Sequence, residues 1–200
     1  MMKKIILLTA AIGFIAFGMM AQTHAKKADY SFLKGEKSFN IEYVYEDMTV
    51  GKKLTEEEYV NKKVEDYNKK EAGKGDKWKI SWEESRTKRY EPKFETLINK
   101  SMAKINMTAS KNSDAKYTLI VKTIYTEPGY NIGISKRPAF VNFEFSFIET
   151  ATKNVMHTSI LHKVPGAQAM GYDFDTGSRI AECYAKGGKM LGAYIYKFHK

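Results

Sequence analysis

The sequence contains little of what disulfide scaffolds and metalloproteins are built from, with one cysteine and four histidines among 200 residues. A single thiol cannot close a disulfide within the chain, so the fold must be stabilised by its core alone. The histidines, at positions 24, 157, 162 and 199, do not have the spacing of zinc ligands, and no Cys-x-x-Cys pair is present. We therefore predict no metal site and expect Cys183 to be a buried, unreactive thiol.

Catalytic motifs are also scarce, since the sequence has neither a Gly-x-Ser-x-Gly turn nor a Gly-rich phosphate loop after a strand. Asp175-Thr176-Gly177 matches the triplet of aspartic proteases, but those enzymes need two such carboxylates and the triplet occurs once. It directly precedes a predicted helix, where Asp173 and Asp175 suit a capping role. We predict no catalytic residue and no cofactor. The alternative is a secreted hydrolase that uses Asp173 or Asp175 with a partner residue that the sequence does not identify.

The composition, 43% hydrophobic and 28% charged, is that of an ordinary globular protein and excludes a disordered chain. The net charge of +10 points to an anionic partner, but the basic residues are spread along the chain. The helices around Trp78 and Trp82 carry nearly as many acids as bases, so we expect core tryptophans that anchor a helix on a sheet. A diffuse surplus of charge favours anionic envelopes or polysaccharides over a specific nucleic-acid groove.

A long apolar run, Ile5–Ala21, follows two lysines near the start of the sequence. This pattern is typical of a secretory signal peptide. We expect residues 1–21 to be the signal, with cleavage after Ala21 or after Ala25, and the protein to be exported to the periplasm or outer envelope. An uncleaved membrane anchor is the alternative, because the run is close to the shortest that spans a bilayer. No cysteine lies near either cut, so we expect no lipoprotein anchor.

Residues 22–37 are polar, and we expect them to form a loose lead-in segment ahead of the fold. A single domain is predicted over residues 38–200. Alternating apolar residues predict strands at 38–50, 105–107, 116–126, 139–149 and 155–164, and helical spacing predicts helices at 55–73, 76–102 and 178–198. The fold class that follows is α+β: a mixed, largely antiparallel sheet of about five strands packed against three or four helices.

The residue patterns also predict details within these elements. Thr55 and Glu58 form the pattern of a capping box, and Asp76 is the expected cap of the second helix. The strand at 116–126 is apolar on both faces, which predicts a central strand covered on both sides at least in part. Pro92 is expected to kink its helix or start a new one. Gly187, Gly188 and Gly192 should let the last helix lie close to the sheet.

The segment 125–138 is the strongest candidate for a binding site. It places aromatic, aliphatic and basic residues between two strong strands, in the kind of loop where binding residues concentrate. We predict Tyr130, Lys136 and Arg137 as binding residues. The alternative is an edge hairpin with ordinary packing.

Several short segments together resemble an uncharacterised family of small secreted proteins from Gram-negative gut anaerobes. They are Tyr59-Val60 with Lys62-Lys63, Gly75–Trp78, Glu91–Phe94, Glu127–Gly129 and Phe174–Gly177, the last followed by Arg179-Ile180 and Tyr184–Lys186. The resemblance covers residues 38–197 and implies no catalytic residue, since no activity is assigned to that family. The order of elements is also similar to the TolB amino-terminal-like fold, a likeness of topology alone.

These observations predict an exported, non-enzymatic envelope protein that acts as a binding or assembly accessory module. Its expected partner is an envelope protein or an anionic polysaccharide. Peripheral membrane contact is compatible with the charge, whereas specific nucleic-acid binding is not expected.

Overall fold

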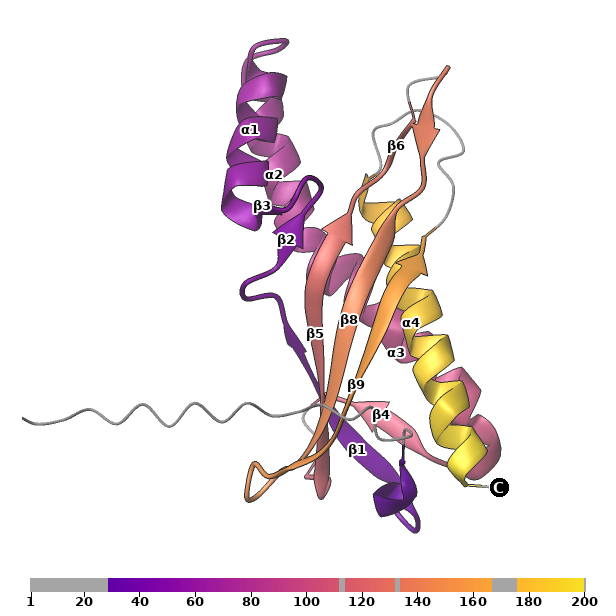
Figure 1. Ribbon diagram of the computed structural model, residues 1–200. Helices are drawn as coiled ribbons and strands as arrows, with labels where there is room; N and C mark the ends of the chain where they lie inside the picture. Colours follow the sequence, from indigo (N-terminus) through magenta and orange to yellow (C-terminus); the bar gives the residue numbers. More distant parts are fainter. Residues whose placement is uncertain (1–28, 112–113, 132–133, 167–175, 200) are drawn as a thin grey trace, which may run out of the picture.

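A mixed β-sheet with helices against one of its faces forms the body of the protein (Figure 1). The computed structural model describes residues 29–111, 114–131, 134–166 and 176–199. The strands are β1 (Ser38–Val44), β2 (Thr49–Val50), β3 (Leu54–Thr55), β4 (Thr108–Ser110), β5 (Tyr117–Glu127), β6 (Tyr130–Asn131), β7 (Lys136–Arg137), β8 (Phe140–Glu149) and β9 (Val155–Pro165). The helices are α1 (Glu56–Asn68), α2 (Lys74–Ser85), α3 (Glu91–Met102) and α4 (Thr176–Phe198). The predicted α+β class and mixed sheet are confirmed.

Strand β5 is the centre of the sheet. It pairs antiparallel with β8, which pairs antiparallel with β9, and it pairs parallel with β1 and β2 along its other side. The single strand predicted over residues 38–50 is therefore interrupted. A turn that contains Asp47, with φ of 60°, separates β1 from β2, yet both pieces lie beside β5.

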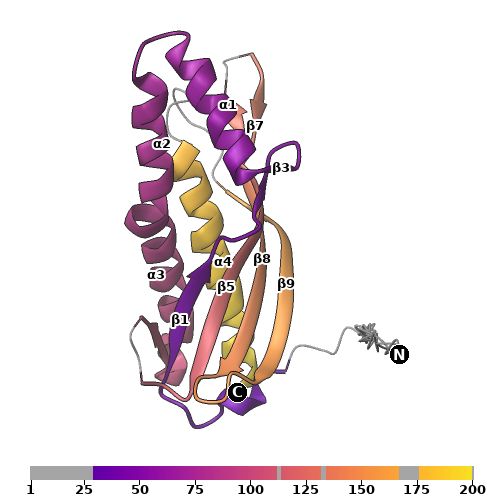
Figure 2. The same ribbon diagram turned by 90° about the vertical axis from the view of Figure 1, so that its left-hand side faces the viewer.

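Alternation along β8 places one row of side chains in the core. Val141, Phe143, Phe145 and Phe147 are each at most 1% exposed, as the sequence pattern predicts. Figure 2 shows α3 and α4 on this face of the sheet, and the described residues place no helix on the other face. The second face of β5, predicted to be covered at least in part, is buried without a helix: Thr118 is fully buried there and Ile120 is half-buried.

The starts of α1 and α2 are set by side chains that bond to backbone amides of the first turn. Helix α1 begins as predicted, because Thr55 and Glu58 form the capping box. Helix α2 begins at Lys74, after Gly73, and not at Asp76. The side-chain oxygen of Asn68 accepts a hydrogen bond from the Gly75 amide at 2.7 Å, which satisfies an amide of the first turn. The prediction of Asp76 as the cap is therefore wrong.

Helices α2 and α3 are joined without a break by a π-helical turn, Arg86–Tyr90, and Pro92 lies in the first turn of α3. The strand predicted at 105–107 is wrong: residues Ala103–Ile105 form a 3-10 turn, Asn106 has φ of 52°, and β4 begins at Thr108. The Asn99 side chain explains this position of β4, because it exchanges two hydrogen bonds with the backbone of Ala109.

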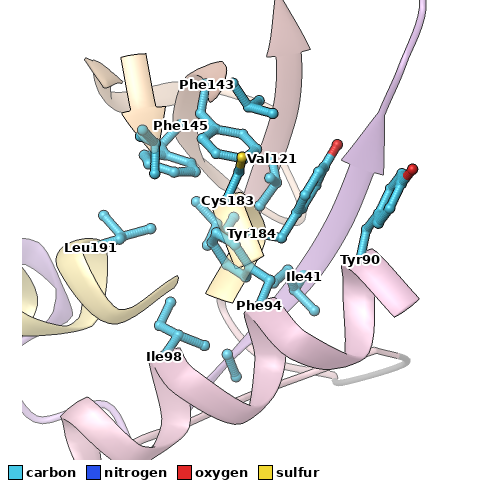
Figure 3. Close-up of a cluster of buried hydrophobic side chains, with 14 of the residues drawn as sticks. Ile41, Tyr90, Phe94, Ile98, Val121, Phe143, Phe145, Cys183, Tyr184 and Leu191 are labelled. Carbon is cyan, nitrogen blue, oxygen red and sulfur yellow. The ribbon is translucent and has the colours of Figure 1, made fainter. Parts of the chain in front are cut away.

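Helix α4 packs closely on both the sheet and α3 (Figure 3). A Cβ at Gly187 would lie 3.0 Å from the ring of Phe143, which confirms the predicted approach to the sheet for this glycine, whereas a Cβ at Gly192 would lie 2.7 Å from Ser101 of α3. A Cβ at Gly188 would lie 2.4 Å from the backbone oxygen of Phe94, so this glycine faces α3. Cys183 of α4 is fully buried in the core. Burial raises the pKa of its thiol to about 12, consistent with the predicted unreactive thiol.

The core begins earlier in the chain than the predicted domain start at residue 38. Tyr30 and Leu33, inside the expected lead-in of residues 22–37, are at most 1% exposed. The Tyr30 ring packs edge-on against Phe147 and Phe198. Among the described residues, no helix is both long and apolar enough to cross a membrane.

Candidate functional site

The predicted binding residues lie on a small hairpin, β6–β7, beyond the end of β5 (Figure 1). Its strands pair antiparallel, and this register places Tyr130 opposite Arg137. Tyr130 is 37% exposed and hydrogen-bonded through its hydroxyl to Ser135. Ile134 is fully exposed, and the side chains of Lys136 and Arg137 are exposed as well. The three predicted residues thus share one hairpin, with Tyr130 and Arg137 on one face and Lys136 on the other. Ile134, which the sequence prediction did not name, is exposed on the same hairpin.

Two buried charged residues fix the base of this hairpin. Glu127, 7% exposed, accepts hydrogen bonds from the Gly129 amide at 3.2 Å and from the guanidinium of Arg137 at 3.2 Å. Arg179 of α4, 5% exposed, donates to the backbone oxygens of Pro128 and Gly129. The hairpin is therefore attached to the body through charge-assisted hydrogen bonds, which are stronger than neutral ones.

Lys136 differs from Arg137 in its surroundings. Arg137 is held by Glu127, so its charge is partly neutralised. Lys136 makes no ion pair with the residues that the structure describes, and its charge is directed at solvent. Charge reversal at position 136 can consequently test binding without disturbing the base of the hairpin.

The described residues do not form a catalytic site of the kind that the hydrolase alternative needs. Asp173 and Asp175 lie outside them, so their predicted capping or catalytic roles are not addressed. His157 packs against the Tyr30 ring, 4.9 Å between ring centroids, and burial lowers its pKa, whereas His162 is exposed on the same strand. The described residues contain no group of three or more His, Cys, Asp or Glu side chains arranged to hold a metal ion.

The two tryptophans pack between α1 and α2, and Trp82 is also buried in the core beside Thr126 of β5 and Met48, in keeping with the predicted core position. Their rings lie 5.5 Å apart, and Tyr59 of α1 lies 5.3 Å from the ring of Trp82. The indole N–H of Trp82 donates to Glu56 at 2.7 Å. Buried in this way, Trp82 is not available to stack on a nucleic-acid base.

A chain of polar contacts under these rings was not foreseen from the sequence. Arg86 donates to both carboxylate oxygens of Glu56 at 2.5 Å, and its guanidinium lies 4.3 Å from the centre of the Tyr45 ring. The Tyr45 hydroxyl donates to Glu91, which is buried and paired with Lys111. Burial raises the pKa of Tyr45, so the hydroxyl remains a hydrogen-bond donor at neutral pH.

This polar chain links the α1–α2 hairpin to the sheet and to α3, and we assign it a structural role. A shallow depression of about 480 Å³ beside Glu91 is lined by Asn40, Glu42, Tyr43, Thr87 and Lys111. Each buried charge is already satisfied by a partner within the protein, as buried ion pairs generally require. No local sequence pattern signals these contacts, because Glu56 and Arg86 are 30 residues apart.

Comparison with known proteins leaves the family open. No protein-family model and no curated protein matches the sequence. Among solved structures, the chain is similar to a DUF330-family protein from Xanthomonas campestris, with 8% identity over 50% of this chain and 58% of that one, at a TM-score of 0.36. It is also similar to a putative neuraminyllactose-binding hemagglutinin homolog from Helicobacter pylori, with 10% identity over 87% of this chain and 92% of that one, at 0.38. A third is PelC, a dodecamer from Paraburkholderia phytofirmans, with 12% identity over 75% of this chain and 86% of that one, at 0.31.

The chain spans little more than half the length of the Xanthomonas protein. Likenesses at these identities and TM-scores carry no argument about what this chain binds. The resemblance to a family of secreted proteins from gut anaerobes and the TolB-like topology stay predictions.

Proposed function

We propose that this protein is an exported, non-enzymatic binding module of the periplasm or outer envelope that contacts an anionic component through the β6–β7 hairpin. The observation that carries the proposal is the full exposure of Ile134 on a hairpin that also exposes Tyr130 and two cations. These four residues, Tyr130, Ile134, Lys136 and Arg137, are called the hairpin surface below.

The composition of the hairpin surface suits binding. Large apolar side chains exposed singly are ordinary, but here an aliphatic and an aromatic side chain lie within five residues of each other. Burying such a side chain against a partner contributes about 1.5–3 kcal/mol. Tyrosine and arginine are also enriched among the residues that dominate binding energies.

The base of the hairpin adds a second reason. Binding by a flexible loop costs conformational entropy, and this cost falls when the loop is fixed beforehand. Glu127 and Arg179 hold the start of the hairpin through hydrogen bonds to Gly129 and its neighbours. The hairpin surface is therefore attached to a base whose conformation is fixed before binding.

The two cations define the chemistry of the partner. Lys136 and Arg137 attract carboxylate or sulfate groups, and an arginine can bind such a group through two hydrogen bonds. An anionic polysaccharide of the envelope fits this chemistry, as does an acidic surface of an envelope protein.

Binding to dextran sulfate, with uncharged dextran as the reference, tests the proposal. We expect the purified protein to bind only the sulfated polymer, and Lys136→Glu to weaken binding by roughly fivefold or more, about 1 kcal/mol. Lys104→Glu, at an exposed lysine far from the hairpin in sequence, is the matched control and should change binding less than twofold. Equal weakening by the two substitutions would assign binding to diffuse charge and contradict the proposal.

Crosslinking in the intact envelope separates the two kinds of partner. A protein partner should be captured by the wild type and lost with Ile134→Ser, but retained with Ile80→Ser, which changes another exposed isoleucine on α2. Dextran sulfate binding without any captured protein points to the polysaccharide.

Export is tested by the mass of the protein recovered from the envelope fraction. We expect a mature chain that begins at Gln22 or Lys26, because cleavage follows Ala21 or Ala25. Recovery of the intact chain from the membrane would instead support the uncleaved anchor.

A further inference from the structure

Exposed apolar side chains also occur along the edge strand β9 and on α4, far from the hairpin surface in sequence. Of the eight large apolar side chains that are exposed in the described residues, five lie on β9 and α4: Val155, Met156, Ile160, Met190 and Tyr194. We call these residues and the groove between β9 and α4 the β9–α4 surface. Ile160 pairs with Glu144 and so is on the face of the sheet away from α4, whereas Met190 and Tyr194 are on α4, so these side chains flank the edge of β9 on both sides.

Strand β9 is an unpaired edge of the sheet. It pairs with β8 on one side, and no strand among the described residues pairs with its other side. Edge strands are normally protected by charge, proline or irregular backbone. Here Lys163, with φ of 52°, and Pro165 protect one end, but His157–Leu161 pair regularly with β8 and contain no lysine, arginine or carboxylate.

A groove adjoins this open edge. It encloses about 250 Å³ between β9 and α4 and is lined mainly by Tyr30, Ser159, Ile160, Leu161, Leu191 and Tyr194. Leu191 forms its buried floor, while Ile160 and Tyr194 are partly exposed at its rim. When a peptide adds to a sheet edge, its backbone pairs with the strand and alternate side chains enter pockets beside it. A groove of this size and apolarity accommodates one such side chain.

The charges at the carboxyl end of β9 are lysines, whereas Glu144 of β8 pairs with Ile160 in the middle of the strand. Strand β9 contains no Asp or Glu, and the single acid of α4, Glu182, is paired with Lys93 of α3. Lys186 of α4 lies at the end of β9, where its ammonium donates to the backbone oxygen of Gly166, and Lys163 is close to that end in sequence. Asp29 is near His157 at the opposite end. The end with the lysines therefore favours carboxylates on the partner.

We propose that the β9–α4 surface binds an extended segment of a partner protein, apolar at alternate positions and acidic at one end, which adds to the sheet as an antiparallel strand beside β9. Antiparallel addition places the acidic amino-terminal end of the segment beside Lys163 and Lys186. A second copy of this chain matches less well, since its own β9 offers no carboxylate to these lysines.

The experiment uses two synthetic peptides that alternate valine and threonine. One carries two glutamates at its amino-terminal end and the other carries two lysines there. Binding is measured by fluorescence anisotropy, and the site of binding by hydrogen exchange of backbone amides. We expect the acidic peptide to bind roughly tenfold more tightly than the basic one, and to slow exchange along β9 but not along β4, at the opposite edge of the sheet.

Two substitutions and their controls locate the site. Ile160→Lys should abolish binding, because it places a charge at the groove and on the edge. Lys186→Glu should reverse the preference between the peptides. Ile80→Lys and Lys104→Glu, at exposed positions elsewhere, should leave both affinities unchanged. Circular dichroism of each variant confirms that it is folded.

Three results would overturn the proposal. One is equal affinity for the two peptides, and another is protection from exchange away from β9. The third is a dimer in sedimentation analysis that Ile160→Lys dissociates, with no peptide bound, which would assign the surface to a second copy. None of these depends on the hairpin surface, so the proposed function is tested separately by Ile134→Ser.

Discussion

Gly188→Ala is expected to lower the free energy of unfolding by about 2 kcal/mol or more. Alanine is normally favoured over glycine in a helix by about 1 kcal/mol, so the expected sign is opposite to that of helix propensity. The reason is steric. A Cβ at position 188 would lie 2.4 Å from the backbone oxygen of Phe94 and 3.1 Å from its carbonyl carbon, and backbone of a packed helix cannot move aside cheaply.

Urea denaturation measures this effect, and Ala193→Gly provides the matched control. Ala193 is exposed on α4, so its replacement should cost only the difference in propensity, about 1 kcal/mol. A Gly188→Ala protein more stable than the wild type would show that α3 and α4 do not approach as closely as described.

Phe143→Ala is expected to lower the free energy of unfolding by about 3–5 kcal/mol, the largest effect among the changes considered. The Phe143 ring is fully buried and lies where the sheet, α3 and α4 meet (Figure 3). Its centroid is 4.9 Å from that of Tyr184 and 5.5 Å from that of Phe145. Removing the ring leaves a cavity that the rigid neighbours cannot fill, which adds to the lost transfer free energy.

Phe140→Ala is the control for this position. Phe140 is also on β8 but is half-buried against Tyr125, on the face that the helices do not cover. Its replacement should cost about 1 kcal/mol, measured in the same denaturation series. Similar losses for the two variants would contradict the placement of the core on one face of the sheet.

The sequence predicted those parts of the fold that local patterns encode. Alternation of Val141, Phe143, Phe145 and Phe147 identified the buried face of β8, and helical spacing identified α4. The capping box of Thr55 was also recognisable, because its two partners are three residues apart. In each case the residues that determine the element are neighbours in the chain.

The predictions were wrong where a side-chain contact outside the local pattern determines where an element begins. The Asn68 side chain sets the start of α2, and Asn99 holds β4 at Ala109, and neither contact has a local signature. The apolar pattern of β5 indicated burial but could not show that helices would cover only one face. The predicted core position is correct for Trp82. Periodicity alone could not show that Trp82 packs against α1.

The same distinction applies to the candidate sites. Tyr130, Lys136 and Arg137 were found from composition, since aromatic and basic residues between two strands stand out in the sequence. The support from Arg179, about 50 residues later, could not be inferred. The β9–α4 surface was missed as well, because it depends on which strand of the sheet remains unpaired.

The most direct test of the proposed binding function is an amide chemical-shift titration of the purified, isotope-labelled protein with a sulfated dextran oligosaccharide. The account predicts that the largest shifts fall on the described residues of the hairpin, Tyr130 and Ile134–Arg137, and that Lys136→Glu removes them. Shifts of equal size at lysines throughout the molecule, or none at the hairpin, would contradict the claim that this surface binds the partner.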